Sequence, residues 1–150
     1  MIEARVTALR KVLHGRPNYG PLRMALYNVA PTLMVCSDYL AGDLLGAYID
    51  DAETIIVDRR LTMDVKRCVL VHELIHWARA DDRCGIRDEH MVRRMTAEAL
   101  IDEHAYRRAE AMYAGCSALI AEELGVTQEI VEDYKMLLSI RMCRPYRIQA

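Results

Sequence analysis

The chain contains no phenylalanine, and it also lacks several features that mark membrane, secreted or nucleic-acid-binding proteins. No apolar run approaches the roughly 20 residues needed to cross a bilayer, so we expect no membrane segment. The first residues begin an amphipathic segment instead of the apolar core of a signal peptide, so we expect no secretory leader. A net charge of −2 does not predict general attraction to nucleic acid or anionic lipid.

The chain has five cysteines, which is an odd number, and no two of them form a C-x-x-C motif. Their wide spacing indicates free thiols in a reducing cytoplasm, not a disulfide framework. They are Cys36, Cys68, Cys84, Cys116 and Cys143. A length of 150 residues predicts a single domain, residues 1–150, with room for a proper core. Nine methionines and eight tyrosines take over part of the packing role of phenylalanine.

The most informative stretch is His72–His76, which reads H-E-L-I-H and is an instance of H-E-x-x-H. On a helix, residues four apart share a face, so His72 and His76 can offer two imidazole nitrogens to one metal ion. Glu73 then lies beside the ion, where it can take a proton from water. The alternative is a pair of core histidines whose nitrogens bind backbone carbonyls.

The pattern of apolar residues predicts a mostly helical α+β chain. No glycine or proline occurs from Thr62 to Cys84, so the motif lies on a helix, with Thr62 or Asp64 as its N-cap. Other helices are expected near residues 2–13 and 21–29, and two more on either side of the Leu124–Thr127 turn, the last reaching Met142. Strands are expected at 32–38, 46–49 and 54–57.

A further helix from Met91 carries a stripe of residues at alternating steps of four and three. Its members are Met91, Met95, Glu98, Asp102, Ala105, Ala109, Met112, Cys116 and Leu119. Two carboxylates in an inward-facing stripe are costly unless a cation meets them. A metal held by the histidines supplies that charge, and an internal salt bridge to an arginine is the alternative. Glu89, Glu103, Glu110 and His104 lie off this stripe, so we interpret them as surface residues.

Two imidazoles and one carboxylate form the ligand set of many catalytic zinc ions. Glu98 is the best candidate for the third ligand, and Asp102 for a carboxylate that orients a ligand imidazole. The reverse assignment of these two acids stays open. With zinc present, Glu73 is expected to serve as the general base of peptide-bond hydrolysis.

Two parts of this site stay less defined by the sequence. The residue that stabilises the oxyanion is not identified, although His90, His104 and Tyr106 are available. The strand Thr54–Val57 precedes the H-E-x-x-H helix, so we expect it to be the edge on which an extended substrate pairs.

These motifs resemble those of the ImmA/IrrE family of zinc metallopeptidases over roughly residues 30–140. The likeness rests on the apolar segment ending in Asp58, on the H-E-L-I-H helix, on Glu98-Ala99-Leu100-Ile101-Asp102-Glu103-His104-Ala105, and on Leu124-Gly125-Val126-Thr127. Family members usually carry E-x-x-A-N-x-F-A, so Glu98 matches the ligand and Asp102 the Asn or Asp. Ile101 and His104 depart from that pattern, and the L-L-M-P that commonly follows is missing.

The resemblance implies a zincin-like helical domain with a small three-stranded antiparallel sheet next to the H-E-x-x-H helix. It also implies a cytoplasmic protein of a bacterium, plasmid or phage that cleaves a helix-turn-helix repressor. From the charge and the lack of a long apolar run, we expect no direct contact with nucleic acid or membrane. An alternative function is a zincin-fold binding module with a structural metal. A DNA-binding regulator built on the carboxy-terminal helices is disfavoured by their acidic residues.

Overall fold

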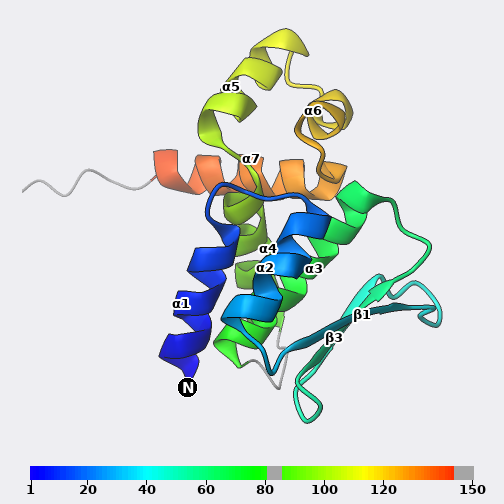
Figure 1. Cartoon of the computed structure of the whole chain (residues 1–150). Coiled ribbons are helices and arrows are strands. Elements are labelled where there is room, and N and C mark those ends of the chain that lie inside the picture. Colours follow the sequence, from blue (N-terminus) through cyan, green and yellow to red (C-terminus); the bar gives the residue numbers. More distant parts are fainter. Residues whose placement is uncertain (81–85, 144–150) are drawn as a thin grey trace, which may run out of the picture.

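The computed structural model describes residues 1–80 and 86–143 (Figure 1). Within these ranges, seven helices accompany one small sheet, so the predicted mostly helical α+β class is confirmed. The helices are α1 (Ile2–Leu13), α2 (Tyr19–Val29), α3 (Met63–Arg79), α4 (Ile86–Leu100), α5 (Glu103–Met112), α6 (Ser117–Leu124) and α7 (Gln128–Met142). The strands are β1 (Met34–Asp38), β2 (Gly46–Ile49) and β3 (Thr54–Asp58). Cys84 and the polar loop around it lie outside the described residues.

Helix α3, which carries the H-E-x-x-H motif, is the structural centre of the fold. It contacts α1, α2 and α4 as well as strands β2 and β3. Its start follows the predicted cap, because the side chain of Thr62 accepts a hydrogen bond from the backbone N–H of Val65. Leu70, Leu74 and Ile75 are at most 1% exposed, so the packing of this helix fixes the position of the motif.

The sheet has the strand order β1-β3-β2. Strand β2 pairs with β3 antiparallel, but β1 pairs with β3 parallel, so the sheet is mixed and the prediction of an antiparallel sheet was wrong. The cause is the order in which the strands are placed in the sheet. After β1 the chain forms β2 at the opposite edge, and a tight turn then places β3 between β1 and β2. Strand β3 is therefore the central strand. The expectation that Thr54–Val57 forms a substrate-pairing edge is also wrong, because both of its sides are occupied.

The long helical stripe predicted from Met91 does not exist as one face. Helix α4 ends at Leu100, and Asp102 begins α5 by accepting a hydrogen bond from the backbone N–H of Ala105. Aspartate favours such N-cap positions because its carboxylate satisfies an exposed N–H. On α4 the buried side chains are those of Val92, Thr96, Ala97 and Leu100. The centre of this face lies roughly 160° around the helix from that of the predicted one, at about 100° per residue.

The carboxy-terminal helices follow the sequence prediction closely. Helix α6 ends at Gly125, which has a left-handed φ of 63°, and Thr127 caps α7 by accepting from the N–H of Ile130. Helix α7 packs across α4, and this contact brings its first two turns toward the H-E-x-x-H helix (Figure 1). None of the helices in the described ranges combines the length and the apolar composition needed to cross a bilayer.

Candidate metal centre

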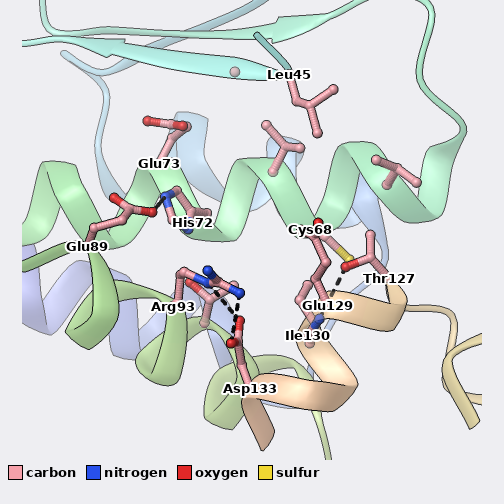
Figure 2. A pocket seen from close by; sticks show the side chains of 14 residues that line it. Leu45, Cys68, His72, Glu73, Glu89, Arg93, Thr127, Glu129, Ile130 and Asp133 are labelled. Atoms are coloured by element: carbon pink, nitrogen blue, oxygen red, sulfur yellow. Dashed lines mark hydrogen bonds and ion pairs between the residues drawn. The ribbon is translucent and has the colours of Figure 1, made fainter. Parts of the chain in front are cut away.

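Three potential metal ligands converge between α3 and the first turn of α4. The Nε2 atoms of His72 and His76 lie 3.2 Å apart. Glu89 places one carboxylate oxygen 3.2 Å from Nε2 of His72 and the other 3.4 Å from Nε2 of His76 (Figure 2). Burial is the main cause that lowers the pKa of His72, which favours the neutral imidazole that a metal requires.

The spacing of these atoms fits a zinc ion. Zinc in proteins is tetrahedral with bonds to nitrogen and oxygen of about 2.0–2.1 Å, so neighbouring ligand atoms are expected about 3.3 Å apart. The separations of 3.2, 3.2 and 3.4 Å are close to that value, with one Glu89 oxygen facing each imidazole nitrogen, and one ligand atom from each of the three residues lies within 4.8 Å of the others. The alternative of two core histidines bound to backbone carbonyls is disfavoured, because both Nε2 atoms face each other and a shared carboxylate.

Glu98, the third ligand predicted from the sequence, is not part of this group. It lies nine residues beyond Glu89 on α4, which corresponds to half a turn around the helix and about 13.5 Å along it. Its side chain is 56% exposed and pairs with Arg141 of α7. The prediction that Glu98 lies with the two histidines is therefore wrong, and the carboxylate beside them is that of Glu89. The alternative for Glu98 was an internal salt bridge to an arginine. The structure contains a salt bridge between Glu98 and Arg141, but it lies at the surface.

Asp102, predicted to orient a ligand imidazole, lies at the other end of α4. Its carboxylate caps α5, and it lies 3.7 Å from the guanidinium of Arg16. The backbone N–H of Ala105 is the main cause that lowers its pKa. Asp102 therefore stabilises the turn between α4 and α5. Neither of its predicted roles, as a metal ligand or as support for a ligand, fits this position.

Glu73 is placed as the sequence predicts, beside the histidines without joining the group of three. Burial, with a smaller contribution from Glu89, raises the pKa of its carboxyl to about 7. Strand β2 covers this side chain closely: a Cβ added at Gly46 would lie 3.3 Å from Oε1 of Glu73 and only 2.3 Å from Cγ1 of Val69. Glycine at this position allows the strand to approach the helix.

A cavity of about 320 Å³ opens beside the histidine pair and extends along α3 to the start of α7 (Figure 2). Its apolar walls come from Leu45, Val65, Val69 and Ile130. Its polar lining is formed by His72, Glu73, Glu89, Arg93, Thr96, Thr127, Glu129 and Asp133. The arrangement combines three potential metal ligands, a partly buried carboxyl with a raised pKa and a cavity with room for part of a peptide, and metal-assisted hydrolysis uses these elements.

Sequence reasoning missed Glu89, Arg93 and Asp133 as members of this site. The signal that identifies Glu89 is a different stripe on α4, in which Glu89, Val92, Thr96 and Leu100 recur at steps of three and four. This stripe contains the valine and leucine that are buried, whereas the predicted one relied on methionines. The sequence gives no comparable indication for Asp133, because only the packing of α7 on α4 brings this residue to the cavity.

Comparison of the chain with protein-family models, with curated proteins and with solved structures finds no match, so its functional assignment depends on the chemistry of this site.

Proposed function

We propose that the chain is a zinc-dependent endopeptidase in which His72, His76 and Glu89 hold the metal and Glu73 is the general base. The observation that carries this proposal is the convergence of two imidazole nitrogens and one carboxylate at the spacing of zinc ligands. The adjacent, partly buried carboxyl of Glu73 has no role in a purely structural metal site. Its presence therefore favours catalysis over metal binding alone.

The chemistry follows from the properties of these groups. When bound, zinc acts as a Lewis acid that lowers the pKa of water and polarises a carbonyl group. Glu73 accepts the proton of the attacking water and passes it to the leaving amine. Burial raises the pKa of this carboxyl, and a more basic carboxylate accepts the proton of water more readily.

The proposed substrate is an exposed segment of another protein. The cavity is bordered by Leu45 and Gly46, where edge strand β2 begins, so an extended segment can pair with β2 instead of with β3. The resemblance to the ImmA/IrrE family suggests a helix-turn-helix repressor as that protein. This choice of partner depends on the resemblance alone.

Replacing Glu73 with Gln tests the proposal. We expect Glu73→Gln to retain stoichiometric zinc while hydrolysis of fluorescein-labelled casein and of candidate repressors falls by about 10²-fold or more. Glu122→Gln, an exposed position on α6, is the matched control. Full function in Glu73→Gln would contradict the proposal and favour the binding module with a structural metal.

A further inference from the structure

The cavity contains one lysine or arginine side chain among its described lining residues, that of Arg93. Arg93 follows Glu89 by one turn on α4, so the two side chains project from the same helix face with Cβ atoms about 5–6 Å apart. Figure 2 shows Arg93 directly after Glu89 along α4, on the side of the cavity that His72 also lines. A guanidinium therefore lies next to the proposed metal ligands.

A second helix fixes the orientation of this guanidinium. Asp133 of α7 accepts two hydrogen bonds from Arg93, one from Nε at 3.0 Å and one from Nη2 at 2.9 Å. The Asp133 side chain is 20% exposed and that of Arg93 is 40% exposed, so the pair is partly shielded from water. This bidentate contact uses one edge of the guanidinium. Nη1 has no hydrogen-bond partner in the part of the chain that the structure describes, which leaves donors available to a bound substrate.

We infer that Arg93 is a catalytic residue that donates a hydrogen bond to the oxyanion formed at the scissile carbonyl, and that Asp133 is its positioning residue. The inference rests on the proposed peptidase function. The attack of water on a carbonyl places a negative charge on its oxygen, and a preoriented cation stabilises that charge without reorganising during the reaction. Arginine suits this task because its planar group stays charged and keeps a fixed set of donors.

The candidates suggested by the sequence do not fill this role. His90 and His104 are exposed and do not line the cavity. Tyr106 is 1% exposed, stacks against Tyr134 and donates its hydroxyl hydrogen to Glu110. Arg93 thus has both the charge and the position that these side chains lack.

The competing explanation is that Arg93 and Asp133 only tie α4 to α7. Binding of inorganic phosphate to the cobalt(II)-substituted protein separates the two explanations, because phosphate is a tetrahedral oxyanion and the cobalt absorption spectrum reports the metal site directly. A structural tie affects folding and leaves the affinity for phosphate unchanged. An oxyanion contact changes that affinity while the cobalt spectrum of the free site stays the same.

The variants are Arg93→Met, Arg93→Lys and Asp133→Asn. Arg94→Met, on the same helix but outside the cavity lining, removes an equal charge and is the matched control. We expect Arg93→Met to weaken phosphate binding by about tenfold or more, and Arg93→Lys and Asp133→Asn to weaken it less. Arg94→Met should leave it within about twofold. Azide, which needs only the metal, should bind all variants alike.

Each result bears on a separate claim. No cobalt spectrum in the wild-type protein would overturn the proposed metal centre itself. A normal spectrum with equal phosphate affinity in wild type and Arg93→Met, or with no phosphate binding in either, would overturn only the role of Arg93. If Arg93→Met fails to fold, Arg93→Lys and Asp133→Asn decide the question by the same comparison.

Discussion

The exchange of Glu98 for Glu89 as the third ligand gives the most direct test of the site. Glu89→Gln removes the carboxylate charge whose oxygens lie 3.2 and 3.4 Å from the two imidazole nitrogens. Disturbing a residue that merely supports a ligand costs about 10–100-fold in metal affinity, so weakening a ligand itself should cost at least about 100-fold. Glu98→Gln breaks only an exposed pair with Arg141, worth about 0–1 kcal/mol of folding free energy, and should leave zinc affinity unchanged.

Zinc affinity is measured by competition with a chromogenic chelator, and the gain in thermal stability gives an independent readout. A ligand present at 100 times its Kd stabilises the folded state by about 2.7 kcal/mol. For a chain of 150 residues this corresponds to a rise in Tm of roughly 5–10 °C. At that zinc concentration, wild type and Glu98→Gln should show the full rise, whereas Glu89→Gln should show a rise of roughly 1–2 °C or less.

The reasoning is refuted if Glu98→Gln loses zinc while Glu89→Gln keeps it. That outcome would restore the assignment made from the sequence and would require α4 to present its opposite face to α3. Equal loss in both variants would also contradict it, because residues half a turn apart on one helix cannot both reach the same pair of imidazoles.

Two further predictions test the elements that surround the site. Gly46→Ala places a methyl group 2.3 Å from Cγ1 of Val69, so this variant should lower the free energy of unfolding by about 1–3 kcal/mol and reduce hydrolysis. The control Gly20→Ala places its methyl group in open space and should change the free energy of unfolding by about 1 kcal/mol or less. Chemical denaturation measures both values. Asp58 is buried and accepts hydrogen bonds from Arg60 and Leu40, and these bonds hold its pKa well below the ordinary value of 3.8. The stabilisation is complete above that value and is lost as the pH falls below it, so Tm should drop more steeply between pH 5 and 2 in wild type than in Asp58→Asn; equal slopes would contradict this.

The helix ends are the part of the fold that the sequence predicts best. Thr62 and Thr127 begin α3 and α7 as expected, and Gly125 ends α6 in the left-handed conformation. These features depend on one side chain and the backbone next to it, so they can be recognised without knowledge of the tertiary structure. The H-E-x-x-H pair belongs to the same class, because its geometry is set within one helix.

The sheet and the contact of α7 with α4 depend on residues distant in the chain. The positions of the three strands can be predicted from their apolar and β-branched residues, but the placement of β3 between β1 and β2 cannot. Strand order is decided by which pairing lets the sheet cover α3, and this is a property of the assembled core. The pairing of Arg93 with Asp133 is non-local in the same way.

The proposed third ligand shows why a search for buried carboxylates selects an acid far from the histidines. An acid within an apolar stripe indicates a ligand because a charged group inside the core needs a cation. A catalytic metal, however, must be reached by substrate, and its ligands therefore lie where the core meets the surface. Glu89 is 41% exposed and lies in the first turn of α4, where it lines the cavity. A search that starts from the histidine pair and looks for an acid on the first turn of the next packed helix finds Asp88, which pairs with Arg79, and Glu89, and it excludes Glu98.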